Sequence, residues 1–343
     1  MTLISNLQIG AKIGNGHFGE VHLGTDDVHG QVAVKIFTKL PGETDPDWQA
    51  RKTGLLKEGQ RLSRAEHANV VKVHALLESA TSDAVHLVMD YCPGGCLHKK
   101  FEAGPMPLAD VRKYATHVTI GLAALHARNM IHRDIKPANI LLNKHGAARL
   151  GDFGLVTDNI LAGYASVQGY NDHLALEIHN GGATSVKTDI WALGMTIYRM
   201  IHGAEWYSTL PAPRHVVGKG GFAKQLPFLP HVPKAWRTVL RTMMHDDTGA
   251  RYQTANAALA AYARLHTTPR WECDVAAGKV SWTCVHKKRN YFVVWEKVGS
   301  AFDWTARSEP IGKGNKRSLG SSTGVNYDTA DRELTALFAK IAN

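Results

Sequence analysis

Two short polar loops, each set between apolar runs, constrain this chain more than any other feature. The first has the sequence MIHRDIKPANILL at residues 130–142, and the second has LGDFG at residues 150–154. The flanking apolar runs predict strands, which would hold the two loops in fixed positions. Between them the loops carry two carboxylates, an amide and an amine, on Asp134, Asp152, Asn139 and Lys136. Such groups can orient a hydroxyl, supply hard oxygen ligands to a cation, and neutralise a phosphate.

In residues and spacing, the two loops resemble the motifs H-R-D-x-K-x-x-N and D-F-G of eukaryotic-type protein kinases. The resemblance implies that Asp134 orients the attacking hydroxyl and that Lys136 holds the γ-phosphate of ATP. It also implies that Asn139 and Asp152 bind Mg²⁺. The alternative is a polar loop that lies between two strands by chance. Two matching motifs at a fitting separation argue against that alternative.

A glycine-rich segment near the N-terminus resembles the same family. Residues 14–21 read GNGHFGEV and lead into a predicted strand. Dinucleotide-binding folds also use G-x-G-x-x-G, but their glycines lead into a helix. The next predicted strand reads VAVKI at residues 32–36. A lone lysine on a strand is usually exposed surface, but the resemblance places Lys35 on the α- and β-phosphates. The ATP-binding residues implied for this region are Gly14, Gly16, Gly19, Val21, Ala33 and Lys35.

Residues 45–66 are predicted to form a helix that begins with an Asp-Pro pair. By resemblance, Glu58 is the ion-pair partner of Lys35, because it lies nine residues before an HANVV segment that follows the equivalent helix in kinases. Gly54 and Gly59 each weaken a helix by about 1 kcal/mol relative to alanine. We therefore expect a soft helix, and we expect Gly59→Ala to stabilise it.

The segment VHLVMDYCPGG at residues 85–95 resembles the last strand of the small lobe and the hinge that follows it. By resemblance Met89 is the gatekeeper residue, and backbone groups of Asp90 and Cys92 bind adenine. The apolar faces of the adenine site are then Val21, Ala33 and Leu141. We interpret Cys92 and Cys96 as packing or hinge residues and not as reactive thiols.

Residues 152–177 correspond to the activation segment of the family. The segment ends in LALE where kinases usually carry A-P-E, and Tyr170 stands where Ser/Thr kinases usually carry threonine. Both departures concern the substrate side of the site and not the transfer chemistry. Glu177 is expected to pair with Arg251. Asp189 is expected to accept backbone N–H groups of the catalytic loop.

Ser166 is predicted to be a regulatory phosphorylation site. It lies eleven residues before Glu177, close to the offset at which related kinases carry such a phosphate. A phosphate there would neutralise Arg133 and order the segment through charge-assisted hydrogen bonds. The alternative is an ordinary loop serine, with Arg133 met by a carbonyl or by Asp158.

The fold class expected is α+β. The resemblance covers residues 7–266, with a β-rich small lobe at about 7–89, a hinge at about 90–95 and an α-rich large lobe at about 96–266. Residues 270–343 resemble no family that we can name. Alternating residues at 280–285 and 291–296 predict a hairpin, and residues 302–306 a third strand. We expect a Ser/Gly-rich loop at 318–324, a final helix capped by Asp328 or Thr329, and a small α+β domain that folds separately from the two lobes.

A formal net charge of +10 favours acidic or phosphate-bearing partners, although a diffuse basic surface would give the same number. The loops KKR at 287–289 and KGNKR at 313–317, with tryptophans nearby, could meet nucleic acid. Such turns are more often solvated and such tryptophans more often core, so we favour that interpretation. Four cysteines without a zinc or disulfide pattern and an N-terminus without a signal peptide indicate a cytoplasmic protein. No apolar run is long enough for a membrane helix, so no membrane partner is expected.

The resemblance implies an ATP- and Mg²⁺-dependent serine/threonine protein kinase. Lys136 favours Ser/Thr specificity, because tyrosine kinases usually replace that lysine. One alternative is a kinase-fold enzyme that acts on a small molecule or RNA, although such enzymes usually lack the Glu177 and Arg251 pattern. Another is a pseudokinase scaffold, although Lys35, Asp134, Asn139 and Asp152 are all present. The sequence identifies neither the protein substrate nor the oligomeric state.

Overall fold

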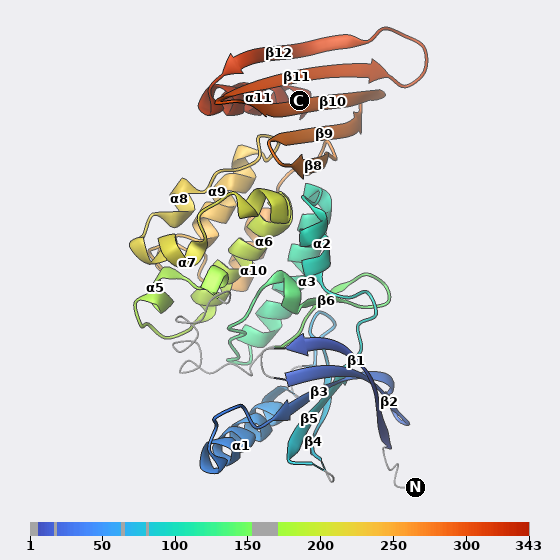
Figure 1. The fold of residues 1–343 in the computed structure, drawn as a ribbon, viewed down its shortest axis with the longest axis vertical. Helices are drawn as coiled ribbons and strands as arrows, with labels where there is room; N and C mark the ends of the chain where they lie inside the picture. The colour runs from blue at the N-terminus through green and yellow to red at the C-terminus, as the bar shows by residue number, and fades with distance from the viewer. Residues whose placement is uncertain (1–5, 17–18, 63–65, 80–81, 153–170, 343) are drawn as a thin grey trace.

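The computed structural model describes residues 6–16, 19–62, 66–79, 82–152 and 171–342. Over these residues the chain forms a β-rich small lobe, an α-rich large lobe, and a C-terminal sheet with a helix, arranged one after another along the long axis (Figure 1). The predicted fold class, α+β and two-lobed with an added C-terminal sheet and helix, is therefore confirmed.

Alternating apolar residues build the antiparallel sheet of the small lobe. In β3 (Gly30–Thr38) the side chains of Val32, Val34 and Phe37 are fully buried, which fixes this strand in the middle of the sheet. The strands lie in the order β1 (Leu7–Gly16), β2 (Gly19–Asp26), β3, β5 (Ala84–Asp90) and β4 (Val73–Glu78).

Helix α1 (Asp45–Leu62) packs on this sheet through the fully buried Trp48, whose indole N–H donates to Asp83 at 2.7 Å. Its two glycines have different surroundings. A Cβ added to Gly54 would meet nothing within 4 Å, whereas one added to Gly59 would lie 2.8 Å from Cδ2 of Leu76. This packing speaks against the expectation that Gly59→Ala stabilises the helix, because Leu76 would have to shift, and helix propensity does not report what lies opposite a glycine.

The large lobe is built around α6 (Val186–Ser208), most of whose residues are buried. Ser185 caps the helix: it accepts the N–H of Lys187 at 3.2 Å, while the hydroxyl of Thr188 accepts the N–H of Ser185 at 2.9 Å. The other helices and strands of the lobe are α2 (Leu97–Ala103), α3 (Leu108–His126), β6 (Ile140–Leu142), β7 (Ala148–Leu150), α5 (Leu176–His179), α7 (Pro213–Val216), α8 (Phe222–Gln225), α9 (Lys234–Met243) and α10 (Ala255–Ala263). Short 3-10 turns occur at Pro137–Asn139, Asn171–His173 and Val217–Lys219.

The C-terminal region is a five-stranded antiparallel meander covered on one face by α11 (Tyr327–Ala342). The predicted hairpin and third strand are present as β9 (Lys279–His286), β10 (Arg289–Val298) and β11 (Ala301–Pro310). β8 (Glu272–Ala276) and β12 (Arg317–Val325) form the two edges. The buried side chains of the inner face come from alternate positions and include Val280, Trp282, Cys284, Val293, Trp295, Trp304 and Ala306.

Two local expectations for this region are wrong. Residues 318–324 belong to strand β12 and not to a loop. Gly320 has no side chain because a Cβ there would lie 2.9 Å from the ring of Trp304 on β11. The final helix is capped by Asn326, whose Oδ1 accepts the N–H of Thr329 at 2.8 Å.

The C-terminal sheet packs directly against the large lobe, at the end opposite the small lobe (Figure 1). Trp295 of β10 lies against Trp206 of α6, with ring centroids 6.4 Å apart. The ring of Phe338 on α11 lies edge-on to His231 of the large lobe, at 6.1 Å. The two regions thus share one buried core, which speaks against a C-terminal unit that folds separately.

Within the described ranges, none of the helices combines the length and the apolar character needed to cross a bilayer. All four cysteines, Cys92, Cys96, Cys273 and Cys284, are free thiols.

Candidate active site

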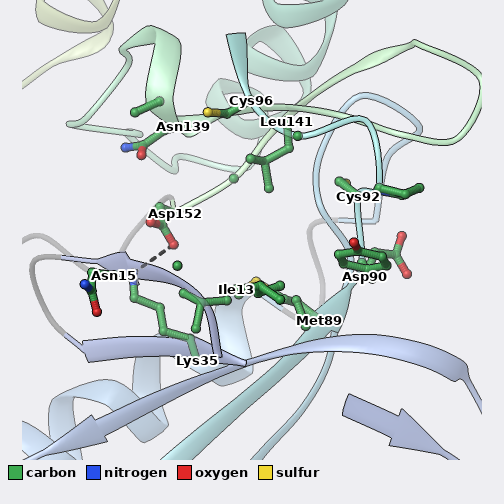
Figure 2. A pocket seen from close by; sticks show the side chains of 18 of the residues that line it. Ile13, Asn15, Lys35, Met89, Asp90, Cys92, Cys96, Asn139, Leu141 and Asp152 are labelled. Carbon is green, nitrogen blue, oxygen red and sulfur yellow. Dashed lines mark hydrogen bonds and ion pairs between the residues drawn. The ribbon is translucent and has the colours of Figure 1, made fainter. Parts of the chain in front are cut away.

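A cavity of about 570 Å³ lies between the two lobes and holds most of the residues that the sequence singles out (Figure 2). It is bounded by β1, β2 and β3 on the side of the small lobe, by the hinge at one end, and by the two polar loops on the side of the large lobe. The sequence-predicted residues that line it are Gly14, Val21, Ala33, Lys35, Met89, Asp90, Cys92, Asp134, Lys136, Asn139, Leu141 and Asp152. Gly19 is described but is not one of these lining residues, whereas only the backbones of Gly16 and Glu58 are described and the whole of Ser166 lies outside the described residues.

Asp134 lies on the floor of the cavity and is held by two neighbours in its own loop. Asn139 donates from Nδ2 to Oδ2 of Asp134 at 2.6 Å and to its backbone carbonyl at 2.9 Å. Lys136 forms an ion pair with the same carboxylate, with Nζ 2.9 Å from Oδ2. Asp134 is 8% exposed and lines the cavity, while Asn139 and Lys136 fix the position of its carboxylate.

The catalytic loop is anchored on the large-lobe side by Asp189 at the start of α6. The buried carboxylate of Asp189 accepts the backbone N–H of His132 at 2.8 Å and that of Arg133 at 2.9 Å. It also lies 2.8 Å from Nε2 of His126. Arg133 has φ +70°, a conformation that costs free energy for any residue with a side chain. The predicted role of Asp189 is confirmed, because its two N–H bonds hold the loop in this strained shape.

His132 links the two polar loops through a neutral imidazole. Its Nδ1 accepts the N–H of Asp134 at 3.2 Å, so Nε2 carries the proton and donates to the carbonyl of Gly151 at 3.1 Å. Complete burial lowers the pKa of His132, which keeps the ring neutral. The loop that carries Asp134 and the loop that carries Asp152 are thus tied to each other directly.

Lys35 reaches from β3 to the second loop. Its Nζ lies 2.9 Å from Oδ1 of Asp152, and its side chain is almost wholly buried (Figure 2). Asp152 has φ +54°, a second strained residue in the site. The backbone of Glu58 belongs to α1, but its side chain lies outside the described residues, so the predicted Lys35–Glu58 pair stays a prediction.

The donor set of the site fits Mg²⁺. The hydrogen bonds of Asn139 and Asp152 use Nδ2 and Oδ1 respectively, so each side chain keeps an oxygen that can bind a hard cation. The described residues contain no group of three or more His, Cys, Asp or Glu side chains arranged to hold a metal. A site of two protein oxygens suits Mg²⁺, which usually draws its other ligands from phosphates and water.

The described glycines of the glycine-rich segment bring backbone close to the cavity or to a neighbouring strand. Gly14 lines the cavity and pairs with Val21 across the β1–β2 ladder. Gly19 has a different reason to be glycine, because a Cβ there would lie 1.9 Å from the carbonyl oxygen of Ile36 on β3. The backbone of Gly16 pairs with Gly19, and residues 17–18 between them lie outside the described residues.

Apolar side chains from both lobes form the walls near the hinge. Met89, Ala33 and Cys92 are buried together, with Val21 and Leu141 packed against them. Burial raises the pKa of the Cys92 thiol to about 11, so this thiol stays protonated and packs as a small apolar group.

Asp90 at the hinge is fixed by both lobes. Its carboxylate lies 2.5 Å from Arg149 of β7 in the large lobe and 2.9 Å from His74 of β4 in the small lobe. Its backbone N–H donates to the carbonyl of Lys72 at 2.9 Å. Of the backbone groups of Asp90, only the carbonyl therefore remains as a group that could bind adenine.

Sequence reasoning missed several residues that line the cavity. Ile13 and Asn15 flank Gly14 on β1, while Tyr91, Pro93 and Gly95 belong to the hinge, and Cys96 and Lys99 lie at the start of α2. Ile13 could have been found from its position one residue before the glycine run. Lys99 carries no local signal, because only the turn of the chain after the hinge brings α2 beside the loop of Asp134.

The predicted pair of Glu177 and Arg251 is confirmed. Two nitrogens of Arg251 each lie 2.7 Å from a different oxygen of Glu177, across 74 residues of sequence. The pair forms although the segment lacks the proline of the A-P-E motif. Tyr170 and Ser166 lie outside the described residues.

The sequence profile described as "Protein kinase domain" matches residues 7–262. The chain is similar to "Mitogen-activated protein kinase kinase kinase YODA" of Arabidopsis thaliana, with 31% identity over 71% of this chain and 27% of that protein. It is also similar to "Aurora/IPL1-related protein kinase 2" of Caenorhabditis elegans, with 31% identity over 58% of this chain and 64% of that protein. The chain thus spans less than two thirds of the length of each of these relatives. Since the profile covers most of the chain and the cavity carries the residues of its motifs, this chain belongs to the protein kinase domain family.

Proposed function

We propose that this protein is a serine/threonine protein kinase that transfers the γ-phosphate of ATP to a hydroxyl of a protein. One observation carries the proposal: Asp134, Lys136 and Asn139 bind one another on the floor of the cavity into which Lys35 and Asp152 also reach. The similarity to "Serine/threonine-protein kinase TOS3" of Saccharomyces cerevisiae supports the class.

In this proposal each residue acts by position and charge. Asp134 accepts a hydrogen bond from the acceptor hydroxyl and later its proton. Lys136, beside it, neutralises charge on the transferred phosphoryl group, and Lys35 holds the α- and β-phosphates. Bound Mg²⁺ would supply further charge neutralisation, held by Asn139 and Asp152. The carbonyl of Asp90 and the N–H of Cys92 would bind adenine between Val21, Ala33 and Leu141.

The position of Asp134 suits transfer to a hydroxyl that is held in the cavity. Asp134 is 8% exposed and lines the cavity. A hydroxyl placed there is positioned as in an intramolecular reaction, which accounts for much of the catalysis available to kinases. The free thiols fit the proposal that the protein works in a reducing cytoplasm.

The test uses purified full-length protein, labelled ATP and a cell lysate, with Asp134→Ala beside the wild type. We expect the variant to lose at least about 100-fold in transfer while it binds nucleotide normally. Asp328→Ala, which removes an exposed carboxylate from α11, serves as the control and should keep full activity. Wild-type turnover in a folded Asp134→Ala protein would show that the mechanism is wrong, and phosphate found only on a small molecule or RNA would show that the acceptor class is wrong.

The role of Mg²⁺ has its own test. Asn139→Ala and Asp152→Ala should each raise the Mg²⁺ concentration needed for tight nucleotide binding, because each removes a hard oxygen ligand. Nucleotide affinity in the wild type should fall when EDTA is added. Affinity that EDTA leaves unchanged would count against this metal site.

Phosphorylation of Ser166 remains part of the proposal on sequence grounds. The guanidinium of Arg133 donates to Oγ1 of Thr184 at 3.1 Å, close to the start of α6 and to the catalytic loop. A phosphate bound near this guanidinium would reach both the start of α6 and the catalytic loop. Mass spectrometry of active enzyme, with kinetics on Ser166→Ala, tests the idea. An unmodified residue and an unchanged turnover in the variant would end it.

A further inference from the structure

Two loops lie side by side at one end of the C-terminal sheet and together form a surface that we name the basic tip. The first is the turn at Lys287 and Lys288 between β9 and β10, and the second is residues 311–316 between β11 and β12. The N–H of Ile311 donates to the carbonyl of Lys288 at 3.0 Å, which fixes one loop against the other. The tip comprises Lys287, Lys288, Arg289, Lys313, Lys316 and Arg317, with Val285 and Ile311 among them.

The charge of the basic tip is almost all of one sign. Among the described residues, the acidic side chain that forms an ion pair with a cation of the tip is Glu309. Its Oε1 lies 3.0 Å from Nζ of Lys316. Arg289 donates instead to neutral oxygens, those of Ser308 and Asn315. Lys287, Lys288, Lys313 and Arg317 are exposed and form no ion pair with the described part of the chain. Six cations against one carboxylate create a local positive potential that attracts anions.

The turn holds both lysines in a conformation that is unfavourable for a residue with a side chain. Lys287 has φ +46° and Lys288 has φ +59°, so both occupy the left-handed region in a two-residue hairpin turn. Such a turn favours Asn-Gly, and a lysine in this conformation strains the backbone. Strain of this kind persists where a side chain is needed for function.

Exposed aliphatic side chains indicate what kind of anion the basic tip meets. Ile311 is 58% exposed and Val285 is 63% exposed, both in the midst of the lysines. The tryptophans of the sheet, in contrast, are buried, with Trp282 at 0%, Trp295 at 3% and Trp304 at 7% exposure. The nearest other rings, Tyr291 and Phe292 on β10, are partly buried, and the guanidinium of Arg307 lies over the ring of Phe292. The tip itself thus carries aliphatic and not aromatic side chains, whereas single-stranded nucleic acids stack on aromatic platforms. Aliphatic side chains gain little beside a phosphate backbone but are buried favourably at a lipid interface.

We propose that the basic tip binds the anionic headgroups of a membrane surface, with Ile311 and Val285 entering the interface between lysines. The loop between β11 and β12 projects from the end of the molecule that is remote from the small lobe, so a bound membrane leaves the cavity between the lobes open (Figure 1). The inference departs from the expectation of no membrane partner, which rested on the lack of a spanning segment. It does not depend on the proposed phosphoryl transfer.

The test is cosedimentation of the full-length protein with vesicles of phosphatidylcholine, with or without phosphatidylserine. We expect binding only when phosphatidylserine is present, and weaker binding as salt is added. Replacing three lysines in Lys287→Gln/Lys288→Gln/Lys313→Gln should weaken binding roughly 100-fold, at about fivefold per charge. The matched control is Lys279→Gln/Lys297→Gln/Lys340→Gln, which removes three exposed lysines of the same region outside the tip and should bind like the wild type.

Two further variants keep the result interpretable. Ile311→Ser should weaken vesicle binding about tenfold without changing its salt dependence, because it removes apolar area and no charge. Lys287→Asn/Lys288→Gly should raise the thermal stability of the protein while it lowers vesicle binding, because the turn loses strain and charge together. Unchanged vesicle binding in Lys287→Asn/Lys288→Gly would overturn the proposal. It would also be overturned if the two triple variants lost vesicle binding to the same extent. Binding to duplex DNA that ignores Ile311→Ser, without binding to anionic vesicles, would assign the basic tip to nucleic acid instead.

Discussion

Trp282 of the C-terminal sheet donates its indole N–H to Nδ1 of His231 in the large lobe, at a distance of 3.0 Å. Both side chains are almost wholly buried, with Trp282 at 0% and His231 at 5% exposure. The bond requires an imidazole that is unprotonated at Nδ1. Burial lowers the pKa of His231 to about 3, which keeps the ring neutral over the whole physiological range.

The burial of His231 and His202 makes the stability of the protein sensitive to acid. The pKa of His231 is about 3 in the folded chain against an ordinary value of 6.5, and burial gives His202 the same shift. Above about pH 6.5 both imidazoles are neutral in the folded and in the unfolded chain, so neither histidine lowers the free energy of unfolding. As the pH falls from 6.5 toward 3, only the unfolded chain takes up the protons, so each histidine lowers the free energy of unfolding by about 1.4 kcal/mol per pH unit.

Urea unfolding at about pH 7 and about pH 5 measures this slope. His231→Gln should show a smaller loss between the two pH values than the wild type, because glutamine does not titrate and its Oε1 can still accept from Trp282. Equal losses in the two proteins would show that His231 does not contribute to acid sensitivity.

Truncation after Thr268 should destabilise the large lobe. The cut removes Trp282, Trp295 and Phe338, and it uncovers Trp206 and His231 on the large lobe. Loss of one large buried aromatic typically costs about 3–5 kcal/mol, so the truncated chain should unfold at lower temperature and aggregate. Soluble fraction, dye binding and thermal unfolding are the measurements. A monomeric fragment of wild-type stability would instead restore the expectation that the C-terminal region folds as a separate unit.

Two arginines with the same bidentate geometry should differ in their effect on stability. Arg251 is buried against Glu177, whereas the side chain of Arg270 is 50% exposed beside Asp110. Arg251→Met should cost about 3–5 kcal/mol, because it leaves Glu177 without its partner at a largely buried site. Arg270→Met should cost about 1 kcal/mol or less, since solvent screens the exposed pair. Denaturant unfolding of both variants decides the matter, and comparable losses would contradict the burial argument.

The residues of the site can be predicted from the sequence far better than the tertiary contacts around them can. Asp134, Asn139 and Asp152 could be placed because their motifs fix residue type and spacing within a few residues of chain. The alternation around Trp282 and Trp295 also predicts which face of the sheet is buried. It cannot name what covers that face, and the covering residues, Trp206 and His231, are remote in sequence and carry no pattern of their own.

Strand β12 was missed for a related reason. Its Ser/Gly-rich sequence has low strand propensity and no alternating apolar residues. The strand forms because small residues are needed where Gly320 lies on the ring of Trp304. Close approach to a large side chain thus outweighs propensity, and only the structure reveals it.

The glycines of α1 give the sharpest comparison of propensity with packing. Gly54 faces open space, so Gly54→Ala should stabilise the protein by about 1 kcal/mol through helix propensity and a less flexible unfolded chain. Gly59→Ala gains the same propensity but places a Cβ 2.8 Å from Cδ2 and 3.2 Å from Cβ of Leu76. Overpacking of this kind costs about 1–3 kcal/mol, so the net effect of Gly59→Ala should be neutral or destabilising.

A double-mutant cycle with Leu76→Ala separates the two effects of Gly59→Ala. Leu76→Ala removes the nearest atom, so Gly59→Ala should be less harmful in that background, with a coupling of about 1 kcal/mol or more. Gly54→Ala should act equally in both backgrounds, because nothing within 4 Å of its added Cβ changes. The free energy of unfolding is measured for all six proteins. If Gly59→Ala stabilises the wild type as much as Gly54→Ala does, the contact with Leu76 imposes no cost, and helix propensity alone governs α1.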